Sequence, residues 1–167
     1  MSLKINLDLN LRVEHSKSIG LGSVYNNFTL SRGHVLGDGT EDYSADTIYQ
    51  GERALAYATS ETLDVNDGSL TDSFGDSVTL ATLKAIYVKN NSDDASLLIG
   101  GAAANQIGLF NDVSDILKLR PGGEILLTSP DDNGVDVSTN SELKFEHDGT
   151  GTDSLTYEII ISGDAVA

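Results

Sequence analysis

The three histidines are the first residues in the chain that could hold a metal. His15, His34 and His147 lie in different parts of the sequence, none is paired with another at the spacing of metal ligands, and the chain has no cysteine. A zinc or iron site needs several such ligands brought together. The sequence therefore predicts no metal site, and it predicts that the histidines lie in loops or on the surface.

An acidic stretch at residues 131–136, DDNGVD, offers oxygen ligands of the kind that calcium prefers. An EF-hand loop needs oxygens at its positions 1, 3 and 5 and a glutamate at position 12. Here position 12 is Glu142 but position 5 is Val135, so the match is partial. Because Asn-Gly is a strong hairpin signal, we interpret the stretch as the tip of a β-hairpin.

Motifs for catalysis and for phosphate binding are incomplete. Ser23 follows the two glycines of the sequence GLGSV, so the frame differs from the Gly-x-Ser-x-Gly of hydrolases. Gly100-Gly101 has no lysine after it, and Gly20-x-Gly22 lacks the third glycine of a dinucleotide loop. Paired glycosidase carboxylates are defined by their separation in space, which a sequence does not give. We expect no enzyme and no cofactor.

The charge of the chain restricts its partners. Lysine and arginine number 10 against 26 aspartate and glutamate, a formal net charge of −16. Binding to nucleic acid or to anionic lipid needs clustered cations, so neither is an expected partner. No apolar run approaches the roughly 20 residues of a membrane helix, and Met1–Lys4 does not begin a signal peptide. We expect synthesis in a cytoplasm and a soluble protein.

Residues 3–13 carry the clearest secondary-structure signal. Apolar and polar residues alternate strictly, which predicts a strand with one apolar face. The apolar positions are Leu3, Ile5, Leu7, Leu9, Leu11 and Val13. Two interpretations stay open: a strand that covers its own core, or an arm that adds to the sheet of a neighbouring subunit.

Residues 15–47 are rich in glycine and have no regular period, apart from a short apolar stretch near Phe28–Leu30. This composition predicts long loops or a limb that adapts to a partner surface. Tyr25 and Phe28, together with the six apolar residues of the first strand, are the candidate partner-binding residues.

The remaining strands are predicted from short apolar runs between turn signals. The centre of the pattern is residues 115–130, where Ile116–Leu119 and Ile125–Leu127 flank Arg120-Pro121-Gly122-Gly123, the sequence of a hairpin turn. Other predicted strands are residues 47–65 as one or two strands, 78–89 with 96–99 as a second hairpin, 142–146 and a final strand at 155–161.

This pattern predicts an all-β protein of about eight to ten strands with no helix. Short strands at this spacing are typical of sandwiches and barrels, and we favour a jelly-roll-like β-sandwich. A length of 167 residues fits one domain, residues 1–167. Within it, residues 1–45 are the arm and long early loops and residues 46–163 are the sandwich core.

Residues 46–163 resemble small virion structural proteins of tailed bacteriophages. Six short motifs carry the resemblance: Thr62–Val65, Leu70–Gly75, Leu83–Asn90, Leu97–Gly101, Pro121–Gly123 and Tyr157–Gly163. The resemblance implies a jelly-roll-like module that decorates or cements a capsid from its outer surface. Its implied partners are the major capsid protein and further copies of itself, as a homodimer or homotrimer. The alternative is a head-fibre or tail-associated module that contacts host surface glycans.

Overall fold

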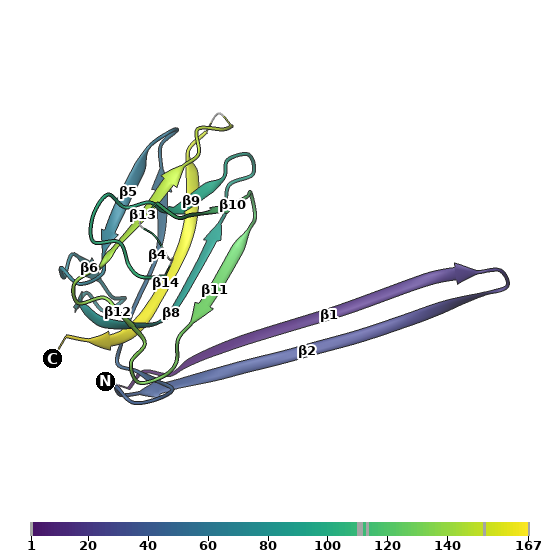
Figure 1. Cartoon of the computed structure of the whole chain (residues 1–167), viewed down its shortest axis with the longest axis horizontal. Helices are drawn as coiled ribbons and strands as arrows, with labels where there is room; N and C mark the ends of the chain where they lie inside the picture. The colour runs from purple at the N-terminus through teal and green to yellow at the C-terminus, as the bar shows by residue number, and fades with distance from the viewer. Residues whose placement is uncertain (1, 110–111, 113, 152, 167) are drawn as a thin grey trace.

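The computed structural model describes residues 2–109, 112, 114–151 and 153–166, and β-strands are the only regular elements in these ranges. Two sheets form a compact body, and one long hairpin projects from an end of it (Figure 1). The first sheet has the order β10-β9-β13-β5, and the second has the order β11-β8-β14-β4 with β12 also paired to β8. Every pair of strands within these two sheets is antiparallel.

The strands of the first sheet are β5 (Ser60–Asp64), β9 (Leu97–Gly100), β10 (Ile116–Leu119) and β13 (Glu142–His147). Those of the second are β4 (Thr47–Leu55), β8 (Leu80–Asn90), β11 (Glu124–Thr128), β12 (Val135–Asp136) and β14 (Leu155–Ala165). Two short strands, β6 (Leu70–Thr71) and β7 (Ser77–Val78), pair with each other. The hairpin consists of β1 (Ile5–Ile19) and β2 (Gly22–Asp38), and β3 (Ser44–Ala45) pairs in parallel with the end of β2.

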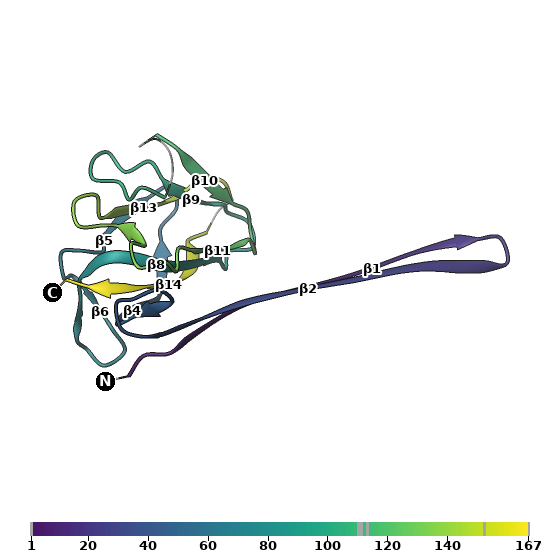
Figure 2. The same cartoon turned by 60° about the horizontal axis from the view of Figure 1, so that its bottom comes forward.

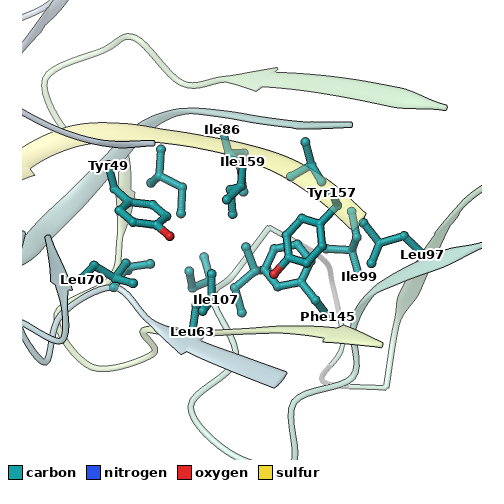
Figure 3. Packing of buried hydrophobic residues seen from close by; sticks show 14 of the residues in the cluster. Tyr49, Leu63, Leu70, Ile86, Leu97, Ile99, Ile107, Phe145, Tyr157 and Ile159 are labelled. Atoms are coloured by element: carbon teal, nitrogen blue, oxygen red, sulfur yellow. The ribbon is translucent and has the colours of Figure 1, made fainter. Parts of the chain in front are cut away.

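Apolar side chains from both sheets meet in one core (Figure 3). Phe145 of β13 and Tyr157 of β14 stack across it with their ring centroids 4.6 Å apart. Alternate residues of β14 are buried from Leu155 to Ile161, as the period of two predicted. The predicted all-β sandwich is confirmed, and the jelly-roll version of it stays a prediction.

Three predicted hairpins are wrong. The strands on either side of the Arg120–Gly123 turn lie in different sheets, because β10 pairs with β9 and β11 pairs with β8. Likewise β8 and β9 belong to opposite sheets. A Pro-Gly-Gly turn reverses the chain in either case, and only the distant partner strands decide whether the chain stays in one sheet or crosses the core. The turn at residues 131–134 is not the tip of a hairpin either, because it joins β11 to β12 and both of these pair with β8 rather than with each other.

A bulge in the second sheet buries a lysine. The register between β8 and β14 shifts between Ser162 and Gly163, so Ala85 pairs with Ser162 and Leu83 pairs with Gly163. Leu83 therefore faces the core, although simple alternation placed it on the face of Ala85. The fully buried Lys84 lies between them, with its Nζ 3.4 Å from the carboxylate of Asp164.

A polar network joins the two sheets at one edge. The guanidinium of Arg53 on β4 donates to the carboxylate of Glu61 on β5 at 2.8 Å and to the Tyr49 hydroxyl at 3.1 Å. The Tyr157 hydroxyl donates to the second oxygen of Glu61 at 3.0 Å. Burial, together with the Glu61 charge, raises the pKa of Tyr157 well above its usual range. Each group has its partner inside the network, so the network fastens β4 and β5 to each other.

Asp148 gives the body a testable pH dependence. Burial raises the pKa of this carboxyl, but hydrogen bonds from Thr150, Lys118 and the Ser96 N–H outweigh burial and hold the pKa well below its usual range. A lowered pKa in the folded state stabilises the fold above the unfolded pKa of about 3.9, and this contribution fades as the pH falls below that value. Asp148→Asn should therefore lower the urea midpoint at pH 7, and the gap to the unmodified protein should narrow steadily below about pH 4. Asp93→Asn, at an exposed aspartate, is the control. A difference in urea midpoint between Asp148→Asn and the unmodified protein that is equal at pH 7 and below pH 4 would contradict the prediction.

Candidate functional site: the projecting hairpin and the groove at its base

The hairpin is the feature of this molecule that reaches beyond its own body. Strands β1 and β2 pair from Ile5↔Leu36 to Ile19↔Gly22 without a register shift, and Gly20 takes the positive φ of 58° that the tight turn requires. At about 3.4 Å per residue, the 15 residues of β1 extend about 50 Å. Figures 1 and 2 show the hairpin leaving the body as a two-stranded ribbon. The prediction of long loops for residues 15–47 is therefore wrong over β2.

The pairing gives the hairpin one apolar and one polar face. Residues directly opposite each other in an antiparallel pair lie on the same face, and Leu11 pairs with Leu30 and Val13 with Phe28. The apolar face holds Ile5, Leu7, Leu9, Leu11, Val13, Ile19, Val24, Phe28, Leu30 and Leu36. The intervening residues, such as Asn10 opposite Ser31, form a largely polar face.

The candidate partner-binding residues divide along this hairpin into three groups. Leu3, Ile5 and Leu7 are half-buried at the base, where they pack against the buried Leu36, Ala45 and Ala85. Leu9, Leu11, Val13 and Phe28 lie beyond the base on the apolar face, and Leu11 and Phe28 are 49% and 54% exposed. Tyr25 is exposed too, but it pairs with Ser16 and so lies on the polar face.

The first interpretation of residues 3–13 is wrong, and the second, an arm that adds to the sheet of a neighbouring subunit, stays a prediction. Only the base of β1 packs on the body, so the strand does not cover the core of its own sandwich. Its partner in this chain is β2, and the outer edge of each hairpin strand is unpaired over the projecting part. A two-stranded hairpin without a third strand or a packing surface is marginally stable in water. Binding to a partner would therefore stabilise the projecting half of the hairpin.

Backbone hydrogen bonds fix the base of the hairpin to the body. The Gly37 N–H donates to the Tyr43 carbonyl at 2.8 Å, and the Tyr43 N–H donates in turn to the carbonyl of Pro130 at 2.6 Å. The Asp132 N–H donates to the Asp42 carboxylate at 2.7 Å. The turn after β11 thus holds the strand that leaves the hairpin, and this fixes the direction in which the hairpin projects.

A groove of about 690 Å³ lies between the hairpin base and the outer face of the second sheet. One side is formed by the hairpin, with Ile5, Leu7 and Leu9. The other side is formed by sheet residues that face away from the core: Ile48, Ala85, Tyr87, Glu124, Leu126, Ile160 and Ser162. Leu126 and Ile160, on the outward face of this sheet, are 39% and 38% exposed. The groove and the apolar face of the hairpin form one continuous apolar surface.

Sequence reasoning selected Phe28 of β2 but missed the other apolar residues of that strand and the whole sheet side of the groove. A signal for β2 was present, because Val24, Phe28, Leu30 and Leu36 all have even numbers and fall on one face of a strand. No comparable signal existed for Tyr87, Leu126 and Ile160. They come from three strands, and only the pairing of Tyr87 with both others places them in one row.

Charge is distributed unevenly between the hairpin and the body. Residues 1–38 contain four lysine and arginine residues against three aspartate and glutamate, whereas residues 39–167 contain six against 23. Arg32 and Lys17 lie on the apolar face of the hairpin, where they pair with Leu9 and Val24. The hairpin segment therefore carries no net negative charge and does not repel an acidic surface as the body does.

The residues considered for metal chemistry lie apart. His15 and His34 are on the hairpin, whereas His147 is in the body, and no cluster of three His, Asp or Glu side chains in the described ranges could hold a metal ion. The prediction of a loop or surface position is wrong for His147, which is buried with its Nδ1 accepting the Gly149 N–H at 3.0 Å. In the 131–136 stretch, the carbonyls of Asp131 and Asp132 accept from the Lys84 ammonium, so this turn already holds a cation.

The same ranges contain no helix that is long and apolar enough to cross a membrane. Comparison of the chain with models of known protein families and with curated protein sequences finds no match.

Proposed function

We propose that this chain is a structural virion protein that decorates or cements a bacteriophage capsid. It binds the lattice of the major capsid protein as a homo-oligomer on the outer surface of the shell, and it acts without catalysis. The observation that carries the proposal is the projecting hairpin with its exposed apolar face. The resemblance of residues 46–163 to virion structural proteins is the reason for proposing a capsid protein as the partner.

The hairpin supports an adhesive role for physical reasons. A monomeric soluble protein rarely exposes a contiguous apolar surface of this kind, and such surfaces mark sites of protein interaction. The body that carries the hairpin is rigid, because its core is continuous across both sheets. A rigid acidic body stays soluble in many copies, while a nearly neutral arm makes the contacts.

Capsid binding by matched variants tests the proposal. Purified protein should bind expanded capsids and raise the temperature at which they release their contents. Phe28→Asp should weaken capsid binding at least about tenfold, because burial of a phenylalanine contributes about 1.5–3 kcal/mol and a buried aspartate opposes binding. Thr29→Asp adds the same charge at the next residue on the polar face and should bind almost normally.

Two results would overturn the proposal. One is a protein that ignores capsids at every concentration tested. The other is binding to host cells or to host glycans when no capsid is present, without any binding to capsids, which is the behaviour of a fibre-associated or tail-associated receptor module.

A further inference from the structure

We infer that the groove at the hairpin base is the docking site for the projecting hairpin of a second copy of this chain. Each copy then contributes a hairpin to one neighbour and offers a groove to the same or another neighbour. The inference rests on the proposed function in that it takes the protein to be a homo-oligomer. It identifies the contact that holds the copies together.

The apolar surfaces match in kind. The exposed part of the hairpin presents Leu9, Leu11, Val13 and Phe28 on one face, and the groove presents Leu126 and Ile160 beside the hairpin base of its own chain. Sheets pack face to face about 10 Å apart, with apolar side chains of the two faces between them. A second hairpin laid on this sheet would cover apolar residues on both partners that the single chain leaves exposed.

Charge selects the second copy's hairpin as the occupant of the groove. One end of the groove meets a row of charged residues across the outer face of the sheet, Glu52, Glu158, Lys89 and Glu124, which pair in that order across β4, β14, β8 and β11. Three of the four are carboxylates. Arg32 and Lys17 lie among the apolar residues of the hairpin, so an incoming hairpin brings cations to this row. Opposite potentials of this kind orient a complex and disfavour the wrong pairings.

The same charges disfavour the two other ways in which copies could meet. Two bodies repel each other, because residues 39–167 hold 23 acidic residues against six basic ones. Two apolar hairpin faces laid against each other would bring Arg32 and Lys17 of one copy near those of the next, with no carboxylate on that face between the pairs Ile5↔Leu36 and Ile19↔Gly22. Hairpin against groove is the pairing in which apolar surface is covered and charges are complementary.

A mixing experiment tests the inference without any capsid. Sedimentation velocity should show that the unmodified protein self-associates. Leu11→Asp impairs the hairpin and leaves the groove, whereas Leu126→Asp impairs the groove and leaves the hairpin. Each variant alone should associate at least about tenfold more weakly than the unmodified protein. An equimolar mixture should regain a two-chain species, because one intact hairpin still meets one intact groove.

Matched controls separate this effect from a loss of folding. Asn10→Asp puts the same charge on the polar face beside Leu11, and Thr128→Asp puts it on β11 outside the groove lining. Both should associate like the unmodified protein. All four variants should keep the far-ultraviolet β signal and the urea midpoint, since each replaced side chain is at least partly exposed.

Three results would overturn the inference: an unmodified protein that stays monomeric, a Leu126→Asp variant that associates normally, or a mixture that associates no better than its components. The second of these would indicate contact between hairpins. Failure here is distinct from failure of the proposed function. A monomer that binds capsids refutes the groove contact and the homo-oligomer but leaves the capsid role, and an oligomer that ignores capsids refutes the capsid role alone.

Discussion

Lys84→Met lowers the free energy of unfolding by an expected 3–5 kcal/mol or so, the cost of breaking a buried ion pair. The Lys84 side chain is fully buried, and its ammonium donates to the carbonyl oxygens of Asp131 and Asp132 and lies 3.4 Å from the Asp164 carboxylate. Methionine keeps most of the apolar stem but leaves a buried carboxylate and two carbonyls without their cation. Urea unfolding at pH 7, with linear extrapolation to water, measures the loss.

Two further variants make this prediction specific. Lys89→Met removes a lysine from the outer face of the same strand, and its cost should stay below about 1 kcal/mol because a surface pair contributes little. Adding Asp164→Asn to Lys84→Met should recover part of the loss, since the buried negative charge is then gone. A loss below about 1 kcal/mol for Lys84→Met would mean that the pair does not stabilise the fold.

Gly163→Ala should be the second severely destabilising substitution. A Cβ at Gly163 would stand 1.9 Å from the Thr82 carbonyl oxygen and 3.1 Å from the Leu83 Cα, and both are backbone atoms that cannot rotate away. The bulge between β8 and β14 brings the two strands this close. We expect a loss of about 3 kcal/mol, the upper range for overpacking, measured as a lowered urea midpoint.

Gly37→Ala is the matched control for this prediction. Gly37 also lies in a strand, but nothing lies within 4 Å of the position that its Cβ would take. Its substitution should change the free energy of unfolding by less than about 0.5 kcal/mol or stabilise the fold slightly. Equal effects at the two glycines would show that the close approach at Gly163 is relieved by movement of the backbone.

Substitutions at Lys84 and Gly163 should also affect the hairpin, because both sites are linked to the segment that attaches the hairpin to the body. The Gly163 carbonyl accepts the Asp46 N–H at 3.1 Å, directly after β3. The turn held by Lys84 contains Asp132, whose N–H donates to the Asp42 carboxylate. We therefore expect that a variant at either site that remains folded will orient the hairpin less well.

Local pattern was sufficient to predict strands whose apolar residues alternate without interruption. Residues 3–13 are the best example, because apolar and polar residues alternate at every position, and the final strand alternates in the same way apart from Ile160. The second hairpin strand was missed because Gly33, Gly37 and the Asn26-Asn27 pair suggested loops. Those residues tolerate a strand when a partner supplies hydrogen bonds at every second position, and that partner lies up to 31 residues earlier in the chain, as in Ile5↔Leu36.

Partner choice between distant strands explains the other errors. Nothing in Arg120–Gly123 tells whether the flanking strands pair with each other or with β9 and β8. The bulge beside Lys84 changes which residues of β8 face outward, and no local rule predicted it. The sheet side of the groove follows from these non-local choices. The sequence alone therefore pointed to one part of the candidate surface, the apolar residues of β1 together with Phe28.

The uninterrupted pairing of β1 with β2 makes the length of the arm adjustable in steps. Adding two residues to each strand would move the turn outward by about 7 Å and leave every apolar residue on its original side. Adding one residue to each strand would extend the arm by half as much and reverse the faces beyond the insertion. Homologous chains whose arms differ in reach should accordingly differ by even numbers of residues per strand, so that the distance between neighbouring copies could change in evolution while the body stayed the same.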